Sequence, residues 1–216
     1  RDGDKERDWN QEKLGAARAE WDTEYSRFQY YDGKNPDWPE KALSLQYQVA
    51  LENYHRMENE HKTVDELLEE NSEPINAVYT KILTQVMLGA PQYMYHGGML
   101  RATVRYYDAD QVRPGLPPDV GALVDELRAE GVGVQLANIS STETRRVIVQ
   151  AGAFGEHTFT DVAVDNEPPV LVDGKYFAVE LPPSTSIRIQ AGLNRFNNQP
   201  SYAFPWHEDG IPVPFD

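Results

Sequence analysis

The stretch LRATVRYY, residues 100–107, alternates apolar or aromatic side chains with polar ones. This period of two is typical of a strand with one buried face. A parallel sheet would need a helix after each strand, whereas antiparallel strands follow one another through short turns. The sequence therefore predicts a seven-stranded antiparallel β-sandwich within residues 92–193. The six other apolar runs lie at 132–139, 145–150, 158–164, 170–172, 176–181 and 187–191.

One segment of this β-region has a different period, and one turn has a strong signal. Between residues 119 and 130 the apolar side chains recur at three- and four-residue steps, which predicts one inserted short helix that ends at Gly131. Asp173 and Gly174 separate two apolar runs and predict a two-residue hairpin turn. The apolar positions of the expected helix are Val120, Leu123, Val124 and Leu127.

The region before residue 92 carries helical periods throughout. They predict helices over 8–31, from Asp37 past Met57, over 64–70 and over 72–89, with Pro39 in a first turn where its missing amide costs nothing. The fold class is therefore α+β, an N-terminal helical layer followed by the sandwich.

Three parts follow from these periods. Residues 1–91 form a helical segment, 92–193 the sandwich and 194–216 a strap rich in proline and aromatic residues. The helical stripes are rich in Tyr and Ala and bury too little to offset the chain entropy of the segment. We expect the helices to pack on the β-region, on an identical chain or on a preceding domain.

Charge narrows the choice of partners. The 216 residues hold 20 Lys and Arg against 35 Asp and Glu, which gives a net charge of -15 and opposes binding to phosphate backbones and anionic lipids. We expect no nucleic acid and no membrane as a partner. Five arginines could still form a local basic patch, although outward strand positions balanced by acids are the favoured interpretation: Arg101, Arg105, Arg145, Arg146 and Arg188.

The absence of cysteine excludes disulfides, thiolate zinc sites and thiol nucleophiles. No apolar run approaches the length of a membrane span, and no secretory pattern opens the chain, so the compartment stays undetermined. The chain begins at Arg1, and we expect it to be the later part of a longer polypeptide.

Candidates for acid–base chemistry lie in expected loops. They are His96, Glu156, His157 and His207, which could converge at one end of a sandwich. The alternative for each residue is ordinary loop hydrogen bonding, which we favour. The five histidines lack the spacing of a metal site, so we expect no metal and no cofactor.

The aromatic tail suggests ligand binding. Tyr202, Phe204 and Trp206 alternate along the chain near Asn197, and flat apolar faces beside amide groups suit sugar rings. A strap that closes the core, or a subunit interface, has the same composition. The sequence leaves both interpretations open.

Two stretches carry a resemblance to a known class of proteins. QLANISSTETRRVIVQAGAFGEH, residues 135–157, and VELPPSTSIRIQAG, residues 179–192, resemble the C-terminal β-sandwich of large bacterial proteins that have a preceding helical, toroid-type domain, including carbohydrate-active enzymes. In such enzymes the sandwich braces the catalytic domain. The resemblance implies no active-site residue in this chain.

Three functions follow in order of preference. The first is a non-catalytic scaffold or accessory portion, or subunit, of a larger carbohydrate-related enzyme or complex, which braces a catalytic neighbour. The second is a structural protein that assembles with copies of itself. The third is an independent hydrolase or lyase that uses the loop His and Glu residues.

Overall fold

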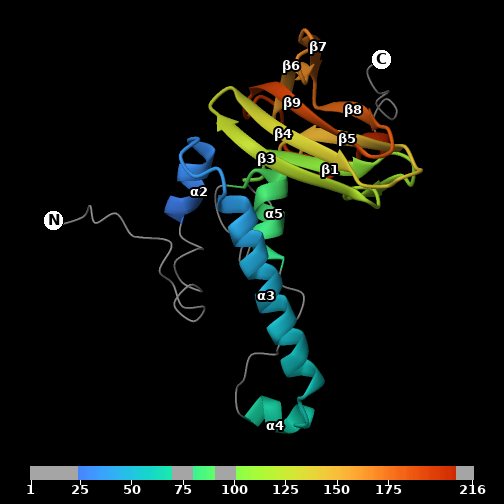
Figure 1. Cartoon of the computed structure of the whole chain (residues 1–216). Coiled ribbons are helices and arrows are strands. Elements are labelled where there is room, and N and C mark those ends of the chain that lie inside the picture. The colour runs from blue at the N-terminus through green and yellow to red at the C-terminus, as the bar shows by residue number, and fades with distance from the viewer. Residues whose placement is uncertain (1–23, 70–79, 91–100, 208–216) are drawn as a thin grey trace, which may run out of the picture. The chain divides into compact units, whose positions relative to one another are not determined.

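The computed structural model describes residues 24–69, 80–90 and 101–207, and the chain divides into two compact units, residues 1–79 and 80–216. Three helices lie in the described part of the first unit (Figure 1): α2 (Glu24–Tyr31), α3 (Trp38–Glu58) and α4 (Val64–Glu69). Helices were predicted in all three places. Residues 8–23 of the first predicted helix lie outside the described residues.

Local chemistry sets the ends of these helices. After α2, Gly33 adopts a φ of 76°, and the Lys34 amide donates to the Gln29 carbonyl at 2.8 Å. Glycine reaches this left-handed conformation without steric cost, which ends the helix. At the start of α4, the Thr63 amide donates to Glu66 Oε2 at 2.7 Å, and the Glu66 amide donates to Thr63 Oγ1 at 3.3 Å. This reciprocal pair is a capping box.

Helix α3 has one buried face and one apolar face that stays exposed. The buried positions are Trp38, Ala42, Gln46 and Val49. Beyond them, Tyr47 is 65% exposed and Tyr54 53%, with Leu51 and Met57 also exposed. In α4, Val64 and Leu68 are exposed as well. None of the described helices combines the length and the apolar character that a membrane crossing requires.

The second unit begins with α5 (Lys81–Leu88), which ends at Gly89 in the left-handed conformation. A β-carbon on Gly89 would lie 3.0 Å from Val124 Cγ1 and 3.2 Å from Leu127 Cδ2, so α5 meets the β-region closely. Residues 72–79 of the predicted helix lie outside the described residues. The strands are β1 (Val104–Asp108), β2 (Arg113–Pro114), β3 (Val120–Arg128), β4 (Gly131–Asn138), β5 (Arg145–Ala151), β6 (Thr158–Val164), β7 (Val170–Gly174), β8 (Tyr176–Leu181) and β9 (Thr185–Asn194).

These strands form two antiparallel sheets, with the orders β2-β1-β5-β8 and β3-β4-β9-β6-β7 (Figure 1). The rings of Phe159 in β6 and Phe177 in β8 lie 4.7 Å apart edge to face, so the two sheets meet there. The protein is α+β, as predicted. Buried side chains on the facing sides include Val104, Tyr106, Val147, Val149 and Val179 from one sheet, and Val124, Val132, Val134, Leu136 and Ile189 from the other.

The predicted count of seven strands is wrong, because the described residues hold nine. All seven expected strands are present within a few residues of their predicted bounds, and β2 and β3 are additional. The inserted helix predicted over residues 119–130 is wrong as well, since most of that segment is β3.

A β-bulge explains this error. Val124 pairs with Val134 and Glu126 with Gly133, so Asp125 is an extra residue in β3. The bulge lengthens one step of the inward pattern from two residues to three, which imitates a helical period. It also places the carboxylates of Asp125 and Glu126 on one side, where Arg188 Nε donates to Asp125 Oδ2 at 2.8 Å and Arg188 Nη2 to Glu126 Oε2 at 3.2 Å.

The predicted hairpin at Asp173 and Gly174 is also wrong. Strand β7 pairs with β6, whereas β8 pairs with β5 in the other sheet. The chain therefore crosses between sheets at Lys175. Asp173 has a φ of 46°, so the dipeptide marks a bend at this crossing and not a two-residue turn.

Candidate functional site

The turn between β5 and β6 encloses a buried carboxylate. Glu156 is 5% exposed, and its Oε1 and Oε2 accept hydrogen bonds from the amides of Ala153 (3.2 Å) and Phe154 (2.7 Å). Gly152 has a φ of 84°, and a β-carbon there would lie 2.5 and 2.6 Å from the two carboxylate oxygens. Only glycine leaves room for the carboxylate inside its own turn.

His157 lies next to this carboxylate and is 3% exposed. Its Nδ1 accepts a hydrogen bond from the Phe196 amide at 3.0 Å, so the neutral ring carries its proton on Nε2, which lies 4.0 Å from Glu156 Oε1. Burial lowers the pKa of His157, with a smaller lowering by Arg195, while Glu156 acts in the opposite direction. The Phe196 ring packs edge to face on the imidazole at 4.6 Å.

The segment after β9 holds the turn in place. The Asn198 amide donates to the Glu156 carbonyl at 3.2 Å, and the Ser201 amide to the Phe154 carbonyl at 2.8 Å. The side-chain amides of Asn197 and Asn198 each donate to Thr158 Oγ1 at 2.9 Å. Asn197, a predicted ligand-binding residue, thus has a partner within the protein.

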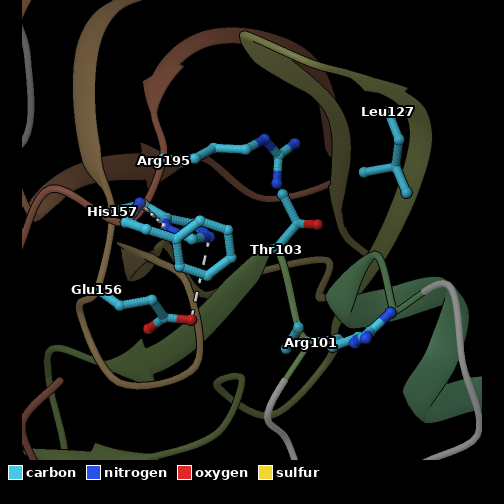
Figure 2. A pocket seen from close by; sticks show the side chains of 8 residues that line it. Arg101, Thr103, Leu127, Glu156, His157 and Arg195 are labelled. Carbon is cyan, nitrogen blue, oxygen red and sulfur yellow. Dashed lines mark hydrogen bonds and ion pairs between the residues drawn. The ribbon is translucent and has the colours of Figure 1, made fainter.

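A hollow of about 440 Å³ opens beside this pair, within the second unit (Figure 2). Two of its residues are fixed by backbone carbonyls. Thr103 Oγ1 donates to the Gly89 carbonyl at 2.8 Å, and Arg195 donates through Nε to Ala129 (2.7 Å) and through Nη2 to Arg128 (2.8 Å). The lining consists of Arg101, Ala102, Thr103, Leu127, Glu156, His157, Arg195 and Phe196.

The geometry favours hydrogen-bond donation over base catalysis. A neutral imidazole accepts a proton through one nitrogen, and on His157 that nitrogen is engaged by the Phe196 amide. Both oxygens of Glu156 likewise accept backbone amides. What the hollow offers to a ligand is the guanidinium groups of Arg101 and Arg195, because the Nε2–H of His157 faces Glu156 Oε1 at 4.0 Å.

Of the other two predicted catalytic residues, His207 does not line this hollow. His96 lies outside the described residues. His207 is exposed in the short 3₁₀ helix η1 (Pro205–His207), where its Nδ1 is 3.4 Å from the Phe204 amide. Over the described ranges, no group of three or more His, Asp and Glu side chains is placed to hold a metal ion.

The aromatic tail packs mainly on the outer face of the four-stranded sheet. Phe204 and Trp206 stack with centroids 5.0 Å apart, and both contact Tyr107 edge to face, at 6.1 and 5.7 Å. Tyr202 is different: it is 87% exposed, and its ring lies 5.3 Å from that of Phe154. The predicted ligand-binding residues therefore divide into two packed rings, one exposed ring and a hydrogen-bonded amide.

Sequence reasoning missed Arg195, Phe196, Thr103 and Leu127 as members of one site. Arg195 and Phe196 follow β9, Leu127 lies in β3 and Thr103 precedes β1, and no local spacing connects these three segments. No protein-family model, curated protein or solved structure matches the chain.

Proposed function

We propose that the chain is a non-catalytic accessory module that docks through its helical unit onto another protein and braces it with a rigid β-sandwich. The observation that carries this proposal is the exposed apolar stripe of α3, formed by Tyr47, Leu51, Tyr54 and Met57. These residues recur at steps of four and three, so they lie along one side of the helix. Contiguous exposed apolar surface of this kind is typical of protein interaction sites.

The candidate site supports a non-catalytic role. His157 has its accepting nitrogen engaged by a backbone amide, and Glu156 is held by two more. A general base needs a free lone pair within reach of the proton that it removes. An independent hydrolase or lyase at this turn is therefore the less favoured alternative.

Charge favours a different protein over a second copy. Residues 37–69 contain eight acidic and three basic side chains, counting only Asp, Glu, Lys and Arg. Two copies that paired through the stripe would bring these acidic surfaces together, and like charges across an interface oppose association. We propose a partner with an apolar groove bordered by Lys and Arg, and self-assembly is the alternative.

A narrower form of the proposal makes the neighbour a carbohydrate-active enzyme, as the resemblance of residues 135–157 and 179–192 implies. In this form Tyr202, whose ring is the most exposed among the described residues of the tail, would contact the sugar. A glycan panel titrated into the purified chain tests it through tryptophan fluorescence. Emission that changes in the wild type but not in Tyr202→Ala would support the sugar contact, and an unchanged signal across the panel would contradict it.

The docking proposal is tested with a photo-crosslinking amino acid placed at Tyr54 of the full chain, and at Tyr202 as a matched exposed control. The species captured only from Tyr54 is identified, purified and titrated against the wild type by calorimetry. We expect Leu51→Glu to weaken this binding by at least tenfold, because a carboxylate would enter the apolar interface. Glu52→Gln, a neighbouring change outside the stripe, leaves the affinity unchanged.

Light scattering on the same variants distinguishes the alternatives. Dimers or larger species that Leu51→Glu dissociates would establish self-assembly in place of a foreign partner. A monomer whose purified captured partner binds equally well after Leu51→Glu would contradict the docking role of the stripe.

A further inference from the structure

The arginines of the second unit divide by their partners. In the described part of this unit, five have a carboxylate within 4.0 Å: Arg113, Arg128, Arg145, Arg146 and Arg188. Arg105 lies 5.2 Å above the ring of Tyr107 and reaches the Ala153 carbonyl. Arg101 and Arg195 have no carboxylate partner among the described residues, and both line the hollow beside His157.

Two arginines without a nearby carboxylate are unusual in a chain with 35 acidic and 20 basic residues. In such a chain an arginine without an acid is the less common case. Arg195 is also partly buried, and desolvation lowers its pKa. A guanidinium that has lost water without gaining a carboxylate favours an incoming anion, because that anion would restore the lost electrostatic stabilisation.

The orientation of Arg195 is fixed before any ligand arrives. Its Nε and Nη2 donate to the Ala129 and Arg128 carbonyls, which leaves Nη1 as the group available to a ligand. In the view of Figure 2, Arg195 reaches across the hollow from one side and Arg101 lies on the other. A donor group held in place in this way loses little conformational entropy on binding.

The rest of the lining selects the kind of anion. Phe196 presents a ring that is 74% exposed, and Leu127 and Ala102 add apolar surface. The buried carboxylate of Glu156 lies in the same hollow and repels a second negative charge. A singly charged carboxylate on a small ring satisfies both conditions better than a doubly charged phosphate does.

We infer that this hollow is a binding site for a small ring-bearing carboxylate, with Arg101 and Arg195 holding the carboxylate group and Phe196 contacting the ring. The site lies within the second unit and is independent of the helical stripe that carries the docking proposal. Benzoate and glucuronate are suitable probes, benzamide is the uncharged control, and inorganic phosphate is the competing anion.

The experiment follows the ring nitrogens of His157 by NMR in the full chain while each probe is added. We expect a saturable shift with benzoate or glucuronate and none with benzamide. Arg101→Gln should weaken binding about tenfold, because one charge-assisted hydrogen bond is lost. Arg101 is exposed and donates no hydrogen bond to another described residue. Arg56→Gln, the same change on an exposed arginine of α3, should leave the affinity unchanged.

Four outcomes would overturn the inference. They are no saturable shift with either carboxylate at millimolar concentration, equal binding of benzamide, phosphate binding without carboxylate binding, and equal weakening by Arg101→Gln and Arg56→Gln. The last would indicate a general effect of net charge and not a defined site.

Discussion

The carboxylate of Glu156 occupies the space in which a side chain on Gly152 would lie. A β-carbon there would approach both carboxylate oxygens to 2.6 Å or less. The two residues thus form one structural element, in which the absence of a side chain at the first position allows the burial of a charge at the second. This element holds the β5–β6 turn and places His157 beside the hollow.

Gly152→Ala should therefore destabilise the second unit by about 3 kcal/mol. Roughly 1 to 2 kcal/mol comes from a non-glycine residue at positive φ, and a similar amount from displacing a buried carboxylate from its two amides. Gly115→Ala is the matched control, because Gly115 has a φ of 95° but a β-carbon there meets only Arg113 Nη1, at 3.7 Å. Equal losses in urea denaturation of the two variants would contradict the coupling between Gly152 and Glu156.

The lowered pKa of His157 makes the stability of the folded chain depend on pH. Because burial lowers its pKa below the unfolded value of about 6.5, the unfolded chain binds more protons, and stability falls as the pH drops below about 6.5. The free energy of unfolding falls by about 1.4 kcal/mol for each pH unit that separates the pKa of His157 in the folded chain from that in the unfolded chain.

His157→Gln retains an acceptor for the Phe196 amide and removes the titration, so the stability advantage of the wild type over the variant should shrink as the pH falls. Melting curves at several pH values measure this difference. His207→Gln, at an exposed histidine, serves as the control. A wild-type advantage over His157→Gln that stays constant from neutral to acidic pH would refute the prediction.

Tyr107 and Gln150 form a buried hydrogen bond that links the outer face of the four-stranded sheet to the turn. The Tyr107 hydroxyl donates to Gln150 Oε1 at 2.8 Å, and Gln150 Nε2 donates to the Gly152 carbonyl at 2.9 Å. Tyr107→Phe should cost about 1 to 3 kcal/mol, because it leaves a buried amide oxygen without its donor. Tyr202→Phe removes an exposed hydroxyl and should cost nothing measurable in the same denaturation assay. An unchanged free energy of unfolding in Tyr107→Phe would contradict this prediction and show that water replaces the lost donor.

Arg188 holds two adjacent carboxylates on the outer surface of the five-stranded sheet. Arg188→Met should destabilise by about 1 kcal/mol at low ionic strength, and less in strong salt, because Asp125 would lose its ion pair and Glu126 would keep only the one with Arg128. Arg145→Met is the comparison, since Arg145 pairs with Asp119 alone, at 3.2 Å. We expect the larger salt dependence for Arg188→Met in thermal melts. Identical salt dependence in the two variants would contradict a network in which Arg188 bridges Asp125 and Glu126.

Much of the fold could be predicted because its signals are local. The alternation in residues 132–139 reflects one strongly buried face, and the sequence carries that pattern whatever the neighbouring strand is. Gly89 ends α5 because it reaches the left-handed conformation, which depends on that residue alone. Such features need no knowledge of distant contacts.

The errors occurred where one residue or one crossing changed the geometry. The bulge at Asp125 shifted a period of two into steps that suit a helix, and composition does not reveal which strand contains an extra residue. At Asp173 and Gly174 the local bend was real, but the sheet that each flanking strand joins is decided by tertiary pairing.

The candidate site shows the same division. Glu156 and His157 could be selected from the sequence because a titratable pair after a glycine-rich turn is a local pattern. Arg101 and Arg195 could not be placed beside Glu156 and His157. Arg101 precedes β1 and Arg195 follows β9, so only the order of the strands in the sheets brings them to the same hollow. Their lack of an acid partner among the described residues is visible only in the folded chain.

The bulge in β3 has a consequence beyond its own sheet. This strand forms one border of the five-stranded sheet, where unsatisfied backbone amides and carbonyls invite another polypeptide to add a strand. An approaching strand would find the ladder out of step at Asp125 and two carboxylates beside it. The irregularity thereby makes this border a poor template for the addition of another strand.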